Sequence, residues 1–219
     1  MGLAVGDALG TTLEFKRPGS FDPLTNMVGG GPFALRPGEW TDDTSMALCL
    51  AESLVERGGF DASDQMERYV RWFRHGHYSV TGRCFDIGVT TSRALTRFEE
   101  TGDPYSGSTD GNTAGNGSIM RLAPVPVAYA RDPATAVRLA GESSRTTHGA
   151  PNCVAACRYL AGVIVGALAG VDKVTLLSDR YAPFPGAWLE EPLTPAIDEV
   201  AAGSFTHKRP PEIRGSGYV

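Results

Sequence analysis

Two adjacent carboxylates, Asp42 and Asp43, lie between two threonines at residues 41–44. The apolar residues that follow from Met46 recur at helical spacing, so this polar motif lies at the start of an expected helix. Carboxylate and hydroxyl oxygens are hard ligands, which suit Mg²⁺, Mn²⁺ or Ca²⁺ rather than zinc. Acids at a helix start also complement the helix dipole without any metal. This motif alone therefore fits a metal site and a helix cap about equally well.

Further acids lie near the starts of other expected helices. Asp7 and Glu14 are seven residues apart and share a face of an expected N-terminal helix, in which Gly6 and Gly10 would permit close approach of another helix or a ligand. Asp86 comes just ahead of another expected helix. A solvated acidic face explains the first pair and a helix cap explains Asp86, so neither position identifies a catalytic acid by itself.

A glycine-containing segment and a histidine complete the set of candidate residues. The segment Gly115-Asn116-Gly117-Ser118 opens an expected helix, where backbone N–H groups can bind phosphate, although an ordinary turn explains it as well. His148 precedes another expected helix, and a lone histidine there is more often a cap or structural donor. Together, the acids, the loop and the histidine favour a metal site in a helical bundle beside a phosphate-bearing ligand.

Helical patterns joined by loops rich in Gly and Pro cover the chain, and no stretch alternates convincingly as a strand. We therefore predict an all-α fold, a compact multi-helix bundle that forms a single domain over residues 1–219. Helices are expected at 3–15, 41–57, from 61, 86–98, 118–130, from 132–133, 150–169, 171–181 and 195–202.

Composition bears on the compartment and on several classes of partner. A net charge of −5, with no run of Lys or Arg, argues against sequence-specific nucleic-acid binding. The four cysteines form no CxxC pair, so we expect buried thiols in a reducing cytoplasm rather than a zinc site. The N-terminus lacks the pattern of a signal peptide. The apolar span at 153–171 contains a single charge, Arg158, and we expect a buried central helix there rather than a membrane segment.

Five segments in register resemble the ADP-ribosylglycohydrolase family, and within it the bacterial dinitrogenase reductase-activating glycohydrolase branch. They are GLAVGDALGTTLEF, WTDDTSMAL, GRCFDIG, GNGSIMRLAPV and the Thr147-His148 pair, and the terminal GSGYV also resembles a family segment. The resemblance implies an all-α fold and hydrolysis of the glycosidic bond at C1″ of ADP-ribose. The implied partner is an ADP-ribosylated protein or a small molecule that contains ADP-ribose.

The resemblance also implies a role for each motif. The matches to ligands of a two-metal site, with Mg²⁺ or Mn²⁺, are Thr41, Asp42 and Asp43. The matches to acids beside the metals, either of which could accept a proton from the attacking water, are Asp86 and Glu14. The matches to residues that hold ADP-ribose are Gly115, Asn116, Gly117, Ser118 and His148, the last of them near the distal ribose or its phosphate.

One element of the family pattern has no counterpart in this chain. Family members carry a second acidic motif of Asp-x-Asp-Thr type near the C-terminus, and no acid after Asp110 fits it. We therefore expect a truncated chain that lacks the C-terminal helices and part of the metal shell. Three functions stay open: an ADP-ribosyl hydrolase, a catalytically impaired binder of ADP-ribose or a related nucleotide, and a structural member of the fold. The intact Asp42-Asp43 pair and the loop at 115–118 argue against the third.

Overall fold

A computed structural model of the chain describes residues 1–17, 19–209, 212–213 and 216–219. Within these residues the regular structure is helical, and extended segments meet only in isolated bridges. This confirms the all-α prediction. The helices are α1 (Gly2–Gly10), η1 (Thr11–Leu13), α2 (Asp42–Arg57), α3 (Ala62–His75), α4 (Val89–Thr101), η2 (Gly111–Thr113), α5 (Pro124–Ala128), α6 (Pro133–Arg145), α7 (Pro151–Leu168), α8 (Lys173–Leu176), α9 (Pro195–Ala201) and η3 (Ser204–Thr206).

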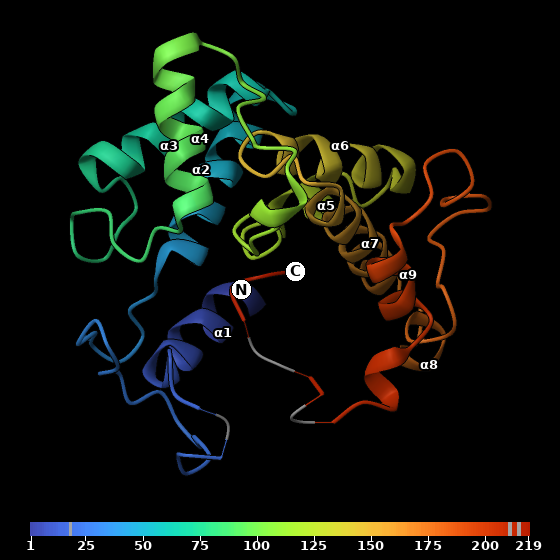
Figure 1. Cartoon of the computed structure of the whole chain (residues 1–219), viewed down its shortest axis with the longest axis horizontal. Coiled ribbons are helices and arrows are strands. Elements are labelled where there is room, and N and C mark those ends of the chain that lie inside the picture. The colour runs from blue at the N-terminus through green and yellow to red at the C-terminus, as the bar shows by residue number, and fades with distance from the viewer. Residues whose placement is uncertain (18, 210–211, 214–215) are drawn as a thin grey trace.

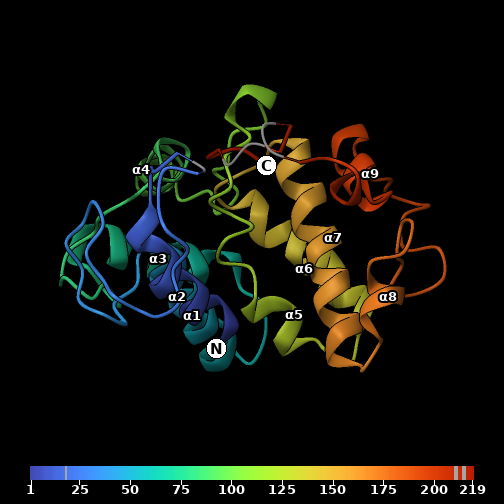
Figure 2. The same ribbon diagram turned by 90° about the horizontal axis from the view of Figure 1, so that it is seen from below.

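The helices lie side by side in successive groups (Figures 1 and 2). Helices α1–α4 lie on one side, α8 and α9 lie on the opposite side, and α5–α7 lie between them. The main apolar cluster draws on α2–α7 and includes the fully buried side chains Leu50, Tyr69, Trp72, Leu95 and Val125. Burial of these large apolar side chains stabilises the packing of the helices against one another, at about 1.5–3 kcal/mol for each aliphatic or phenylalanine-sized group.

Local sequence signals explain where several helices begin and end. The carboxylate of Asp61 accepts a hydrogen bond from the N–H of Asp64 at the start of α3, and Asp132 caps α6 in the same way through Thr135. Helix α2 ends at Gly58, whose φ of 66° is in the left-handed region that favours glycine. These boundaries agree with the sequence-based expectations.

Two expected helices begin later in the structure. The helix expected from residue 86 begins at Val89, and its N-cap is Gly88, so Asp86 does not cap it. The helix expected from residue 118 begins at Pro124, after a turn. Proline is favoured at the first position of a helix, which explains why α5 begins at this residue.

Helix α7 is the long apolar segment anticipated from the sequence. It is long and apolar enough to cross a membrane by length and composition, with a mean hydropathy of 1.4. In the structure α7 packs against α5, α6 and α9, and its one charged side chain is satisfied within the protein. Arg158 donates to the carbonyl of Glu191 at 2.8 Å and lies over the ring of Trp188. Helix α7 therefore packs as an interior helix of the bundle.

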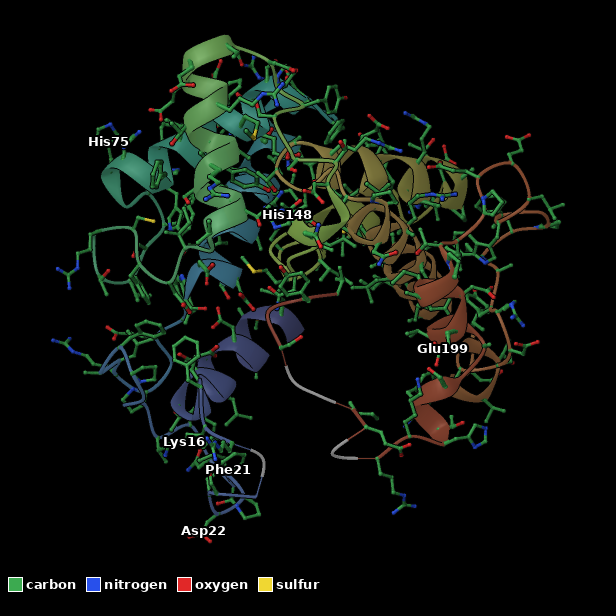
Figure 3. The ribbon with its side chains drawn as sticks, in the orientation of Figure 1. Lys16, Phe21, Asp22, His75, His148 and Glu199 are labelled. Atoms are coloured by element: carbon green, nitrogen blue, oxygen red, sulfur yellow. The ribbon has the colours of Figure 1, made fainter. Side chains whose placement is uncertain are left out.

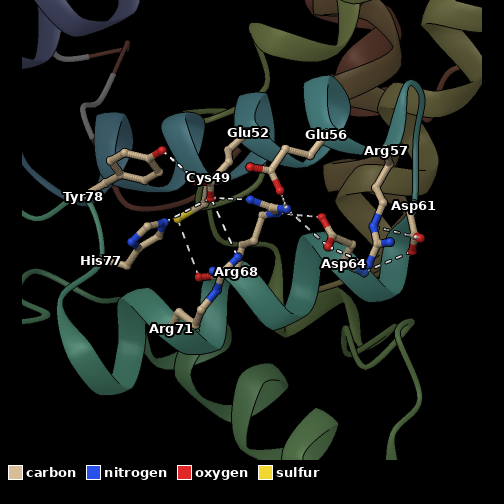
Figure 4. Close-up of polar contacts among 10 residues, drawn as sticks. All are labelled: Cys49, Glu52, Glu56, Arg57, Asp61, Asp64, Arg68, Arg71, His77 and Tyr78. Carbon is tan, nitrogen blue, oxygen red and sulfur yellow. Dashed lines mark hydrogen bonds and ion pairs between the residues drawn. The ribbon is translucent and has the colours of Figure 1, made fainter.

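A buried arginine joins α2 to α3 (Figure 4). The guanidinium of Arg68 contacts Asp64 at 2.6 Å and Glu56 at 2.7 Å, and it also pairs with Glu52. The side chains of Arg68 and Asp64 are 4% and 6% exposed, so this pair is almost fully removed from water. Breaking such a pair costs more than losing a surface salt bridge, because the remaining charge stays buried.

The carboxylate of Glu52 is strongly stabilised in its ionised form. Burial disfavours the charge, but hydrogen bonds from His77, Arg68 and Tyr78 outweigh burial and lower the pKa of Glu52 from 4.5 to about 2. The same balance lowers the pKa of Asp64, where burial is outweighed by hydrogen bonds, the strongest from Arg68. A depressed carboxyl pKa stabilises the folded state above the unfolded pKa, and this contribution is lost as the pH falls through the folded pKa.

We predict that Arg68→Met lowers the free energy of unfolding by about 3 kcal/mol, because it removes the buried cation shared by Asp64 and Glu52 and leaves Asp64 only the half-exposed Arg57. Arg74→Met, which removes the more exposed pair with Glu99, should cost much less. Urea unfolding from pH 6 to pH 2 should also show wild-type stability falling below about pH 4.5, and a shallower fall in Arg68→Met. Equal losses of stability in Arg68→Met and Arg74→Met would contradict the view that the Arg68 ion pairs stabilise the fold more than a surface pair does.

Candidate metal and substrate site

The N-terminus of α2 is capped by a residue from another helix. The carboxylate of Asp7, in α1, accepts hydrogen bonds from the N–H of Thr41 at 3.0 Å and from the N–H of Thr44 at 3.1 Å. It also accepts from the hydroxyls of Thr41 at 2.9 Å and Thr44 at 2.6 Å. One carboxylate thus satisfies four donors at a helix start, where unpaired N–H groups and the helix dipole favour negative charge.

This cap determines how Thr41 can act. Its hydroxyl donates a proton to Asp7, so the lone pairs of its oxygen stay available to a cation. Thr41 is 4% exposed and has an extended backbone immediately before α2. The donor set therefore fits the hard oxygen ligands that the sequence predicted.

Carboxylates from three segments gather near this helix start. Burial first, and then the charges of Asp43 and Asp86, raise the pKa of Asp42 well above its usual range. Burial, followed by the charges of Asp7 and Asp86, raises the pKa of Asp43 to about 7. Glu14 follows the short helix η1, and burial and Asp7 raise its pKa as well. Asp42 is buried and Asp43 is partly buried, whereas Glu14 is exposed. Mutually repelling carboxylates with raised pKa values are typical of sites that bind a cation.

Asp86 reaches this group from the loop before α4. Its φ of 58° lies in the left-handed region, which aspartate tolerates better than most residues. Burial, with the charges of Glu14 and Asp7, raises its pKa to about 6. Asp86 thus combines a rare backbone conformation with a carboxylate that lies near other acids. Such a combination is common at functional sites.

The gathered acids do not form a complete ligand cage by themselves. Across the described parts of the chain, no three His, Cys, Asp or Glu side chains converge in an arrangement that could hold a metal ion. Asp7 does not contribute to such a cage, since its carboxylate oxygens are already occupied by the N–H and O–H donors of Thr41 and Thr44. Metal binding by Thr41, Asp42 and Asp43 stays a prediction.

The segment Gly115–Ser118 forms a turn rather than the first residues of a helix. The hydroxyl of Ser118 points into the protein, where it lies 2.9 Å from the hydroxyl of Ser144. Among the described residues, no acceptor is found for the N–H groups of Gly117 and Ser118. The main chain of this turn, rather than the serine side chain, is thus the part suited to an anionic ligand.

Residues near the end of the chain hold one side of this turn. The N–H of Asn116 donates to the carbonyl of Gly217 at 2.9 Å, and the N–H of Val219 donates to the carbonyl of Ala114 at 3.1 Å. The hydroxyl of Tyr218 reaches the carbonyl of Asn112 at 2.6 Å. The sequence resemblance included the terminal GSGYV, but no pattern indicated that its last residues pair with the loop.

His148 lies in the interior of the molecule (Figure 3), and its ring lies against Gly115 and Gly117 of the turn. The structure thus brings together residues that are far apart in the sequence. A Cβ atom added to Gly117 would lie 2.8 Å from Cε1 of His148 and 2.9 Å from the hydroxyl oxygen of Thr91, in the first turn of α4. Asp86 precedes that same turn, so the start of α4 connects the acidic group to the loop.

Comparison with known proteins identifies the family. The family model described as ADP-ribosylglycohydrolase matches residues 1–219. The chain belongs to the ADP-ribosylglycohydrolase family. A solved structure described as an ADP-ribosylglycohydrolase-related protein complex matches the fold with a TM-score of 0.82 and 47% identity, over 99% of this chain and 68% of that one. The family resemblance expected from the five motifs is therefore confirmed.

Several curated relatives are hydrolases by name. The chain is 42% identical over its full length to the ADP-ribosylarginine hydrolase Tri1 of Serratia proteamaculans and 44% identical to that of Pseudomonas putida. It is 36% identical, over 75% of its length, to the ADP-ribosyl-[dinitrogen reductase] glycohydrolase of Rhodospirillum rubrum. The chain spans 57%, 56% and 54% of the lengths of these relatives, respectively.

We predict that Asp43→Asn stabilises the metal-free protein by about 1–3 kcal/mol at pH 8, because it removes one of several buried carboxylates that repel one another. An acid whose pKa rises on folding, here from 3.8 to about 7, contributes stability at low pH that is lost as the pH rises through 7. Chemical unfolding with a chelator present, from pH 4 to pH 8, should therefore show a smaller loss in Asp43→Asn than in wild type.

The matched control is Asp22→Asn, since Asp22 is exposed. This variant should follow the wild-type pH dependence. If Asp43→Asn shows the wild-type dependence of stability on pH, then repulsion from neighbouring acids does not raise the pKa of Asp43.

Proposed function

We propose that the protein hydrolyses the glycosidic bond at C1″ of ADP-ribose and thereby removes ADP-ribose from modified arginine side chains. The observation that carries this proposal is the group of buried and partly buried carboxylates at the start of α2, joined through the first turn of α4 to the loop that contacts His148. Family membership supports the reaction class, and the names of the Tri1 relatives support arginine as the linkage.

Thr41, Asp42 and Asp43 would hold a divalent cation, Mg²⁺ or Mn²⁺. Their oxygens are the ligand type that such ions prefer, and the hydroxyl of Thr41 keeps its lone pairs free. When bound, the cation supplies charge neutralisation and lowers the pKa of a bound water. Asp7 orients Thr41 and accepts from the N–H groups of Thr41 and Thr44, so these two donors do not occupy the oxygens of Asp42 and Asp43.

Asp86 would accept the proton of the attacking water. Its pKa of about 6 leaves the carboxylate largely ionised near neutral pH yet basic enough to take a proton. Water oxygen forms the new bond to C1″ while the bond from C1″ to the side-chain nitrogen breaks. The electron pair of that bond stays on the nitrogen, and the arginine leaves as a neutral guanidine that takes up the proton from Asp86. Glu14, which also has a raised pKa, is the second candidate for this role.

The loop Gly115–Ser118 and His148 would hold the ADP-ribose itself. Main-chain N–H groups at Gly117 and Ser118 can donate to the diphosphate, as they do in other anion-binding turns. This mode of binding needs few Lys or Arg side chains, in keeping with the net charge of −5. We place the reaction in the cytoplasm, and the free thiols Cys49, Cys84, Cys153 and Cys157 support a reducing compartment.

A second candidate is a catalytically impaired binder of ADP-ribose. The observation that favours it is that, in the described residues, the acids of this chain do not converge into a group of three that could hold a metal. The two candidates share the loop and His148, and they differ in whether bond cleavage accompanies binding.

We predict that the 219-residue chain binds ADP-ribose, and that Gly117→Ala weakens binding about tenfold, because its Cβ would press on His148 and Thr91. Isothermal titration calorimetry with and without Mg²⁺ measures this. Gly111→Ala is the control, since a Cβ there has no heavy atom within 4 Å. The absence of ADP-ribose binding by folded wild type would refute both candidate functions.

We predict that wild type releases ADP-ribose from ADP-ribosylated arginine in a Mg²⁺- or Mn²⁺-dependent manner, and that Asp42→Asn lowers the rate on the order of 100-fold or more. Asp22→Asn should retain the wild-type rate, because the residue is exposed. Chromatography of released ADP-ribose measures the rate. Binding without release by wild type would favour the second candidate, and full activity of Asp42→Asn would contradict the metal assignment.

A further inference from the structure

A buried arginine supports the ADP-ribose loop from below. Arg121 is fully buried, and no carboxylate of the described residues forms an ion pair with it. Its guanidinium donates to the carbonyl of Gly117 at 2.9 Å and to the hydroxyl oxygen of Thr147 at 2.7 Å, and it lies over the ring of Tyr69. The charge is therefore held by neutral oxygens and an aromatic face, and two of these partners lie next to the proposed substrate site.

Thr147 links Arg121 to the neighbouring histidine through hydrogen bonds. Its hydroxyl oxygen lies 2.8 Å from Nδ1 of His148. A guanidinium can only donate, so the Thr147 oxygen accepts from Arg121. The hydroxyl proton of Thr147 then has Nδ1 of His148 as its acceptor, and any other arrangement would leave a buried hydroxyl proton without a partner.

This arrangement sets the state of His148. The ring is neutral, because burial and then the charge of Arg121 lower its pKa to about 3. With Nδ1 accepting a hydrogen bond, the ring proton must be on Nε2. A Cβ atom added to Gly115 or Gly117 would lie 3.3 Å or 3.1 Å from Nε2, so the donor edge of the ring is against the loop. No protein acceptor for Nε2 is present among the described residues.

We propose that Arg121 and Thr147 are positioning residues that fix His148 as its Nε2–H tautomer and direct this donor at the ADP-ribose loop. The significance of this donor for ADP-ribose depends on the function proposed above, whereas the tautomer does not. The same guanidinium holds the carbonyl of Gly117, so the N–H groups of the turn and the ring donor keep a fixed relation. A ligand with acceptor oxygens would match these donors.

The test is ¹⁵N NMR of the histidine rings of the ligand-free chain, followed by calorimetry with ADP-ribose. Wild type should show a protonated Nε2 and an unprotonated Nδ1 on His148. Thr147→Val should move the Nδ1 resonance, because its donor is lost, and should weaken ADP-ribose binding about five- to tenfold. Thr147→Ser should restore both, since it keeps the hydroxyl.

Thr146→Val is the matched control. Thr146 is as fully buried as Thr147, and its hydroxyl donates to the carbonyl of Ser143. Its oxygen also accepts a longer bond from Arg121, at 3.4 Å, but it does not touch the histidine, so this variant tests whether contact with Arg121 alone is enough. It should leave the Nδ1 resonance unchanged. Arg121→Lys cannot reach both Gly117 and Thr147 with a single nitrogen, so it should move Nδ1 in the same direction as Thr147→Val.

The outcomes separate this proposal from the proposed function. A protonated Nδ1 in wild type, or an unchanged Nδ1 in Thr147→Val, would overturn the tautomer assignment. An unchanged Nδ1 in folded Arg121→Lys would remove Arg121 from the assignment. The expected spectra combined with no ADP-ribose binding by wild type would instead refute the proposed function. Should Arg121→Lys fail to fold, the Thr147 variants still decide the state of His148.

Discussion

Crowding of negative charge at the start of α2 is the constraint on which the rest of the site depends. The helix N-terminus offers N–H groups and a favourable dipole, but Asp7 already occupies them through Thr41 and Thr44. Asp42, which is buried, and Asp43, which is partly buried, have only their own N–H groups as donors, and burial and neighbouring charges still raise their pKa values. The fold holds these acids through contacts made elsewhere, including the ion pairs of Arg68 between α2 and α3.

Much of the helical framework was predictable, because its signals are local. Asp61, the Asp132-Pro133 pair and Gly58 mark helix ends through bonds or backbone angles that involve only neighbouring residues. The helix expected from residue 86 was placed too early. An aspartate before a helix is typical of an N-cap, but Asp86 adopts a left-handed backbone and lies near the other acids instead.

The site was predictable as a set of residues but not as an arrangement. Asp7 and Thr41 are separated by 34 residues, most of them in an irregular loop, so no periodicity could pair them. Nor does spacing reveal that the side chain of Ser118 points inward or that Arg121 lies beneath His148. These features depend on the direction of individual side chains, which the packing of α5, α6 and α7 determines.

The pairing of residues 217–219 with the loop at 114–116 has a consequence for biosynthesis. Tyr218 contacts Asn112 across 106 residues of sequence, and the bonds from Asn116 and Val219 span a similar distance. Chains are made from the N-terminus, so the α2–α3 pair can form while the ribosome is still at work. The loop at 114–116 can bond to residues 217–219 only after those residues have left the ribosome. In a stalled nascent chain, the acids could therefore be in position while this side of the loop still lacked its hydrogen-bond partners.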